Sequence, residues 1–147
     1  MQASPDDHWE ASCSCPVSRG SVSVAESWRS FYDETGVPSA VESGALVWVT
    51  GHTGTRADGS VEPDDTEQVR QTFRNVSDSL DSAGLSWDEV AELTTYTVGL
   101  RLHGDVMLEV AGEFLSKPYP AWTAVGVVEL WEEGAIFELQ CVAVRRT

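Results

Sequence analysis

The sequence feature that most constrains the fold is a nearly continuous apolar run at 135–144. Such a run predicts a strand that is buried on both faces. Residues 121–130 form another apolar run, rich in β-branched residues, which also predicts a strand. The segment 131–134 between them is expected to be the connecting turn, in which Gly134 is free to take a positive φ. The chain is therefore expected to fold around a sheet.

A single carboxylate interrupts the run at 135–144. Glu138 is flanked by Phe137 and Leu139, so it is expected to lie among apolar side chains. A carboxylate in such surroundings is unfavourable unless it is paired, hydrogen-bonded or protonated. Glu138 therefore either faces a pocket or has a buried partner, and the local sequence leaves both alternatives open.

The length and charge of the chain restrict its class. The sequence has 147 residues and a formal net charge of −15, which suits one domain that repels phosphate backbones. No apolar run is long enough to span a bilayer, and residues 1–18 lack the basic-then-apolar pattern of a signal peptide. The sequence therefore predicts a soluble cytoplasmic protein that binds neither nucleic acid nor membrane.

The cysteines do not predict a disulfide framework. Cys13 and Cys15 lie in the polar segment 1–18, which we predict to be a flexible tail before a single domain at 19–147. Two thiols at this spacing are a weak metal motif, and no Cys-x-x-Cys or His-x-x-x-His pair elsewhere completes a site. Cys141 is expected to be a small core residue.

The rest of the chain carries further strand and helix patterns. The predicted strands are 21–25, 45–50 and 90–98. Apolar residues at helical spacing predict one helix that opens at 63–65 and ends at Gly84. A second helix is expected to start at Asp105 and to stop before Pro118. The expected loops, which contain glycine or proline, are 27–42, 52–61 and 99–104.

The order of these elements indicates an α+β fold. Each predicted helix lies between strands and has one apolar face, so the most economical arrangement is a single sheet with two helices packed on one face. The other face of the sheet would still carry Trp, Val and Leu side chains. We therefore expect an oligomer that buries this second face.

The motifs Pro-Ala-Trp-Thr-Ala-Val at 120–125 and Phe-Glu-Leu at 137–139 resemble those of the RidA/YjgF family of enamine/imine deaminases. The family signature is Pro-Ala-Arg-x-x-Val, a Leu, a short turn and Val-Glu-Ile, which is similar to 120–125, Leu130 and 137–139. Residues 43–51 resemble the family's hydrophobic run that ends in Ser-Gly-Gln, and 80–90 resemble its Leu-x-x-Ala-Gly link. The resemblance implies a chorismate-mutase-like fold, a homotrimer with pockets between subunits, and no cofactor or metal.

The resemblance also implies catalytic residues. The family hydrolyses reactive enamines and imines, such as 2-aminoacrylate, to keto acids and ammonia. Glu138 matches the family's catalytic glutamate, and an apolar wall would raise its pKa toward neutrality and suit it to general acid/base work. Thr50 and Gly51 match the family's Ser-Gly pair, and His52 stands where glutamine is usual. We interpret Glu138, Thr50 and His52 as the candidate catalytic residues, although a backbone-bonded threonine and a surface-loop histidine are structural alternatives.

The substrate-binding positions depart from the family pattern. Trp122 stands where the family has the arginine that clamps a substrate carboxylate, and Val37 stands where tyrosine is usual. An indole has one N–H donor and no charge, so it cannot bind a carboxylate through a bidentate pair. Trp122 either stacks on a ligand or fills a dead site. Gly51 and Val37 are expected beside it in the substrate pocket, with Tyr119 and Phe114 at its rim or in the core.

Two functions follow from this departure. The first is an enzyme of specialised biosynthesis that acts on a reactive imine, enamine or related neutral small molecule without a carboxylate, in a pocket between subunits. The alternative is a non-catalytic trimer that binds a small molecule or a protein partner after losing deaminase activity. Ribonuclease action, ascribed to some family members, is disfavoured by the negative charge.

Overall fold

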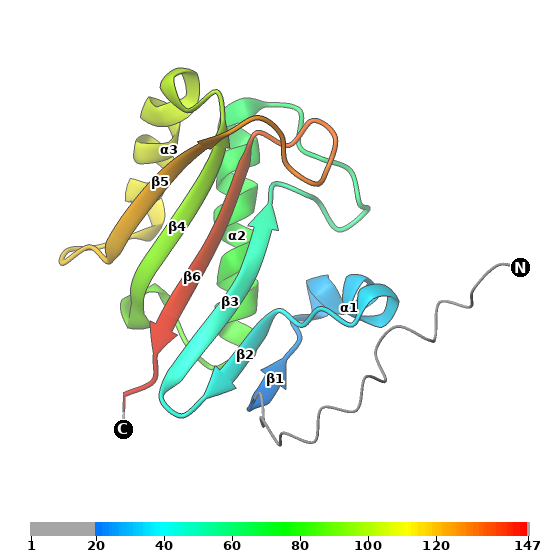
Figure 1. Ribbon diagram of the computed structural model, residues 1–147, viewed down its shortest axis with the longest axis vertical. Coiled ribbons are helices and arrows are strands. Elements are labelled where there is room, and N and C mark those ends of the chain that lie inside the picture. The colour runs from blue at the N-terminus through cyan, green and yellow to red at the C-terminus, as the bar shows by residue number, and fades with distance from the viewer. Residues whose placement is uncertain (1–19, 147) are drawn as a thin grey trace, which may run out of the picture.

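The computed structural model describes residues 20–146, and the predicted tail with Cys13 and Cys15 lies outside the described residues. The described chain forms a six-stranded sheet in the order β1-β2-β3-β6-β4-β5 (Figure 1). The strands are β1 (Ser21–Ser23), β2 (Ala40–Ser43), β3 (Leu46–Thr53), β4 (Val90–Val98), β5 (Ala121–Val127) and β6 (Phe137–Val144). The helices are α1 (Arg29–Thr35), α2 (Asp65–Ser82) and α3 (Leu100–Phe114), with 3₁₀ turns at Glu26–Trp28 and Trp87–Glu89.

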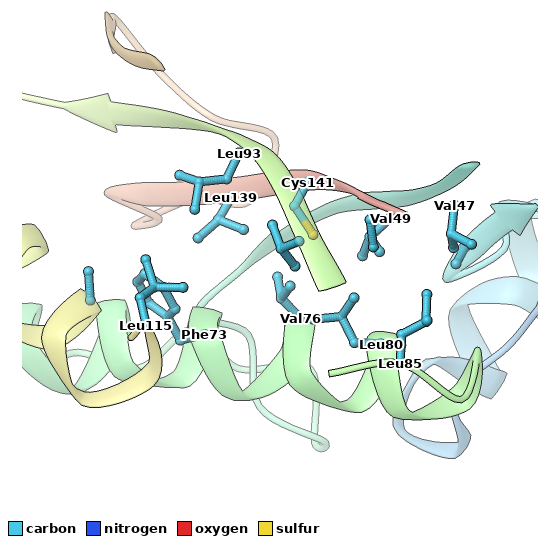
Figure 2. Close-up of a cluster of buried hydrophobic side chains, with 14 of the residues drawn as sticks. Val47, Val49, Phe73, Val76, Leu80, Leu85, Leu93, Leu115, Leu139 and Cys141 are labelled. Atoms are coloured by element: carbon cyan, nitrogen blue, oxygen red, sulfur yellow. The ribbon is translucent and has the colours of Figure 1, made fainter. Parts of the chain in front are cut away.

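Helices α2 and α3 lie on one face of the sheet, and α1 lies near its β1–β2 end (Figure 1). The expected α+β architecture, a single sheet with two long helices on one face, is confirmed. The helix α2 begins where the sequence predicts, because the Asp64 side chain accepts a hydrogen bond from the Glu67 backbone N–H. Its buried residues Phe73, Val76 and Leu80 point toward the sheet (Figure 2).

Strand β6 lies in the middle of the sheet, with β3 and β4 as antiparallel neighbours, and β5 is parallel to β4. Alternate side chains of β6 are buried beneath the helices, namely Phe137, Leu139, Cys141 and Ala143. The intervening side chains lie on the open face, namely Glu138, Gln140, Val142 and Val144. The single chain thus buries only one face of β6, so the prediction of burial on both faces is wrong for the single chain. The core position predicted for Cys141 is confirmed.

The segment 27–42, expected to be a loop, contains both α1 and β2. Gly36, with a φ of 74°, ends the short helix and turns the chain toward the strand, so it separates two elements of a segment that was expected to be irregular. Similarly, β3 continues through Gly51 to Thr53, although the glycine was expected to stop it. His52 is therefore part of a strand, and the surface-loop alternative for it is wrong.

Two other element boundaries differ from the predictions. Helix α3 begins at Leu100 rather than Asp105, because the carbonyl of Gly99 accepts the first hydrogen bonds of the helix. Strand β5 ends at Val127 rather than at the predicted Leu130. Val127 pairs with Val98, the last residue of its parallel partner β4. The expected turn at 131–134 is confirmed.

The sheet face opposite α2 and α3 is apolar and uncovered in the single chain. Its exposed hydrophobic side chains, each 37–52% exposed, are Val22, Leu46, Trp48, Val125 and Val144. Such a face is typical of a subunit that associates with other copies, and the homotrimer stays a prediction. No helix within residues 20–146 is long and apolar enough to cross a membrane. Over the same residues, no group of three or more His, Cys, Asp or Glu side chains is placed to hold a metal ion.

Candidate functional site

A cleft of about 340 Å³ lies where the end of β3 meets β6 and α1. It brings together four of the residues singled out from the sequence, namely Val37, Thr50, Gly51 and Glu138. The other lining residues are Trp28, Phe31, Thr35, Thr53, Trp131 and Glu132. Segments far apart in the sequence therefore converge on Glu138.

Glu138 is the acid/base candidate of this cleft. The strand register places it between Thr53 of β3 and Tyr96 of β4. Its side chain is half-buried, and within residues 20–146 no group donates a hydrogen bond to its carboxylate. Burial, with a smaller contribution from the negative charge of Glu132, raises the pKa of Glu138 above its ordinary value. The carboxylate is thus free to contact water or substrate, and it holds a proton more readily than an exposed glutamate.

Gly51 allows the close approach of this carboxylate to β3. A Cβ atom at position 51 would lie 2.2 Å from Oε1 of Glu138, so any other residue would displace the carboxylate. Beside it, Thr50 donates its hydroxyl proton to the carbonyl of Pro38 at 2.6 Å. This bond holds the β3 end against the segment before β2, and the Thr50 oxygen keeps lone pairs that can accept a hydrogen bond.

The structure does not bring His52 to the Glu138 cleft. A bulge in the pairing of β3 with β6 places His52 on the buried face, in register with Leu139. Its imidazole is 2% exposed, with Nε2 2.7 Å from Oγ of Ser79 and its ring 4.2 Å from that of Trp28. It lines an adjoining cavity of about 220 Å³, which shares Trp28, Phe31, Thr53 and Glu132 with the cleft but does not include Glu138. Burial lowers the pKa of His52 to about 4, so the ring is neutral at pH 7.

This buried imidazole predicts how stability depends on pH. In the unfolded chain His52 titrates near its ordinary pKa of 6.5, whereas in the folded chain it stays neutral down to about pH 4. Stability is therefore fully present above pH 6.5 and falls as the pH drops toward 4, by about 3 kcal/mol at about 1.36 kcal/mol per pKa unit. Urea unfolding between pH 7.5 and 4, at fixed protein concentration, measures this slope. His52→Gln should flatten it over the same range, and an unchanged slope would assign the titration to another group.

Three predicted substrate-binding residues lie outside the cleft of their own chain. Trp122 is in register with the buried Leu93, so it lies on the helix side of the sheet, where its indole N–H donates to Oγ1 of Thr95 at 3.0 Å. Phe114 packs on Phe73, with ring centroids 5.0 Å apart. Tyr119 is exposed and precedes β5. The single chain therefore places these residues in the core or at the β5 edge, away from Glu138.

The aromatic wall of the cleft was missed by the sequence predictions. Trp28 and Phe31 come from the 3₁₀ turn and α1, with ring centroids 4.5 Å apart, and the Trp28 indole N–H donates to the carbonyl of Val37 at 3.0 Å. Trp131, which is 91% exposed, also lines the cleft and comes from the β5–β6 connection. The available signal was the close spacing of aromatic residues in a segment expected to be a loop.

Gln68 of α2 anchors the segment that carries Trp131. Its buried side-chain amide donates to the carbonyls of Glu62 at 2.9 Å and Gly134 at 3.1 Å. Its side-chain oxygen accepts the backbone N–H of Ile136 at 2.6 Å. A polar residue on the apolar face of α2 thus fixes the turn before β6 and, with it, one wall of the cleft.

Among residues 20–146, the side chains that line the cleft include carboxylates and no lysine or arginine. Its charged lining residues are Glu132 and Glu138. A second hollow of about 470 Å³ shares Glu138 and Trp131 with the cleft and adds Tyr96 and Glu129. No lysine or arginine among the described residues lines either space. The local charge therefore disfavours an anionic ligand.

Comparison with known proteins places the chain in a family. The family model described as Endoribonuclease L-PSP matches residues 34–145. The chain is 37% identical over 116 residues to the RutC family protein YjgH of Escherichia coli. This alignment covers 78% of this chain and 87% of YjgH. It is 30% identical over 106 residues to the mitochondrial protein mmf2 of Schizosaccharomyces pombe, covering 71% of this chain and 83% of mmf2.

Solved structures agree with this placement. The structure of protein YjgH matches with a TM-score of 0.79 and 32% identity, covering 88% of this chain and 98% of that chain. RidA from the Antarctic bacterium Psychrobacter sp. matches with a TM-score of 0.69 and 28% identity, covering 74% of this chain and 87% of that chain. The chain therefore belongs to the RidA/YjgF family, whose matching model carries the description Endoribonuclease L-PSP.

Proposed function

We propose that this protein hydrolyses a reactive imine or enamine that carries no carboxylate, with Glu138 as the general acid/base. The observation that carries the proposal is the unbonded, half-buried carboxylate of Glu138 in a cleft lined by aromatic side chains. General acid/base catalysis by one positioned group contributes about 10²–10⁴-fold to a rate. A carboxyl group whose pKa is raised toward the working pH suits that role.

The chemistry needs one group that moves protons. Glu138 takes a proton from water as its oxygen attacks the imine carbon, and passes it to nitrogen to give a carbinolamine. It then carries the hydroxyl proton to the same nitrogen as the C–N bond breaks, which leaves a carbonyl compound and ammonia. Thr50 stands beside Glu138 with lone pairs free to orient the water. No metal or redox cofactor is required for these steps.

Substrates that carry a carboxylate fit this cleft poorly. Such a group would lie close to Glu132 and Glu138, without a described lysine or arginine to neutralise it. The sequence position of the family's arginine holds Trp122, on the helix side of its own sheet. We propose that a second copy of the chain completes the pocket, because Trp122 can join Glu138 only from another subunit and because the open sheet face is apolar.

The experiment follows ammonia and carbonyl formation from two imines made in situ. Benzaldimine, released by a flavin-dependent oxidase acting on benzylamine, has a ring and no carboxylate, whereas 2-aminoacrylate carries one. The protein should accelerate hydrolysis of benzaldimine above the spontaneous rate. It should leave the rate of 2-aminoacrylate hydrolysis nearly unchanged. Preference for 2-aminoacrylate would contradict the proposal, and acceleration of neither would favour a non-catalytic binding protein.

Gly51→Ala should impair turnover with little loss of stability. The new Cβ would displace the Glu138 carboxylate by about an ångström, because the two would otherwise approach to 2.2 Å. A misplacement of that size reduces kcat by about 100-fold. The measurement is benzaldimine turnover together with urea unfolding.

The matched control for this change is Gly112→Ala in α3, where a Cβ has open space within 4 Å. This control should keep full turnover and gain about 0.5–1 kcal/mol of helix stability. Equal turnover in both variants would show that the approach of Glu138 to β3 does not matter for catalysis.

A further inference from the structure

Three carboxylates surround the two hollows beside β6. Glu132 and Glu138 line the cleft, and Glu129 lines the neighbouring space together with Glu138. Both hollows share Trp131, so they form adjoining parts of one concave surface. A ligand in this position lies close to carboxylates of the β5–β6 connection and of β6. Its own charge therefore decides how well it binds.

The walls of the same surface are aromatic. Trp28 and Phe31 come from the 3₁₀ turn and α1, Trp131 from the β5–β6 connection, and Tyr96 from β4. An aromatic face attracts a cation by about 0.5–2 kcal/mol, more strongly as the site becomes drier. Carboxylates and aromatic faces thus favour one class of ligand, a cation with an apolar body.

Arg56 lines the cavity that adjoins the cleft, and Arg29 follows Trp28 in the sequence, but both are engaged with other groups. Arg56 donates through Nε to Glu62 at 2.9 Å, and Arg145 donates through Nε to Glu42 at 3.0 Å. Arg29 lies over the ring of Tyr32, 6.0 Å from its centroid, and does not line either hollow. No lysine or arginine within residues 20–146 lines either hollow, and Arg56, which lines the adjoining cavity, is paired with Glu62.

We propose that this surface binds its substrate as a cation, namely a protonated imine that carries an aromatic or other apolar substituent. The proposal rests on the imine hydrolysis proposed above and specifies its substrate class. An iminium carbon is a better electrophile than the neutral imine, and its charge would lie against Glu138, with Trp131 or Trp28 stacked over the substituent. A cation beside Glu138 also keeps that carboxylate ionised, as a base must be.

The steps balance with water alone. Water attacks the iminium carbon and gives one proton to Glu138, which forms the C–O bond and moves the C=N π pair to nitrogen. Glu138 returns this proton to nitrogen. The C–N bond then breaks as the hydroxyl loses its proton to Glu138, and the departing ammonia takes that proton away as ammonium. The products are a carbonyl compound and ammonium, and Glu138 is regenerated as a carboxylate.

The test is a binding measurement with three probes that share a benzyl group. Benzyltrimethylammonium is the cation, benzyl alcohol is neutral, and phenylacetate is the anion. Calorimetry on the full-length protein should give a Kd for the cation that is lower than that for benzyl alcohol by about tenfold, with phenylacetate weakest. Equal or tighter binding of phenylacetate would overturn the proposal.

Two variants separate a local effect from the net charge of the protein. Glu132→Gln should weaken binding of the cation by about three- to tenfold and leave binding of benzyl alcohol within about twofold, whereas Trp131→Ala should weaken binding of both probes, because both carry the ring that stacks on Trp131. The matched control is Glu109→Gln, an exposed carboxylate of α3 outside both hollows, which should change neither Kd. If Glu132→Gln and Glu109→Gln weaken the cation equally, the attraction comes from the general field and the proposal fails.

Binding and turnover distinguish this inference from the proposed function. Selective binding of benzyltrimethylammonium without benzaldimine turnover would support the cation site and reject the enzyme. Benzaldimine turnover by a protein that binds phenylacetate more tightly than benzyltrimethylammonium would support the enzyme and reject the cation site.

Discussion

Glu138→Gln is expected to lower kcat for benzaldimine hydrolysis by about 10²–10⁴-fold. An amide of the same shape cannot accept the proton of the attacking water or return it to nitrogen. The carboxylate has no hydrogen-bond partner within the described chain, so the substitution removes no structural bond and should preserve the fold. The measurement is kcat at saturating substrate, together with the Kd for benzyl alcohol, which the substitution should leave nearly unchanged.

The control for this prediction is again Glu109→Gln, which removes one negative charge far from the cleft. It should retain wild-type kcat. If Glu138→Gln keeps more than about a tenth of the turnover, the rate does not depend on proton transfer by Glu138. Catalysis would then arise from binding or from another group.

Phe73→Ala is expected to have the largest effect on stability, a loss of about 3–5 kcal/mol. The Phe73 side chain is 0% exposed and packs against Phe137, Phe114 and Trp87, with ring centroids 5.0–6.1 Å away. It therefore joins α2 to β6 and to the end of α3, and its removal leaves a cavity that these elements cannot fill without moving. Urea unfolding at fixed protein concentration measures the loss.

Phe31→Ala provides the matched comparison, because Phe31 lies in the short helix α1 and lines the solvent-open cleft. Its loss should cost roughly 1–2 kcal/mol, since a partly exposed ring forfeits less buried area. Equal losses in the two variants would mean that the aromatic cluster around Phe73 does not stabilise the core more than the cleft wall does.

The parts of the fold that the sequence predicts well are those with a local physical cause. Helix α2 has a capping aspartate, a regular apolar face and a terminal glycine, and each is independent of distant residues. The apolar run at 135–144 marks β6 as a strand in the same way, although it does not show that the single chain buries only one face. Helix α1 was missed because it is only seven residues long and because Phe31 packs on Trp28, which in turn packs on the distant His52 of β3, and local pattern does not reveal such contacts.

The candidate site was predictable only where the residue type itself limits the structure. A carboxylate within an apolar strand must be satisfied or functional, which identified Glu138. The direction of His52 depends on one extra residue at the bulge of β3, because shifting a strand by one position moves a side chain to the other face. The direction of Trp122 depends on the register of β5 with β4. The residues next to His52 and Trp122 in the sequence do not determine either of these strand registers.

The central position of β6 has a consequence for how this protein is made. β6 is the sixth strand to be synthesised, yet it separates β3 from β4 in the sheet. Until β6 emerges from the ribosome, the nascent chain presents two long strands whose inner edges have no partner, and such edges invite pairing with other chains. Folding of the sheet must therefore wait until β6 has been synthesised, and the chain is exposed to pairing with other chains until then.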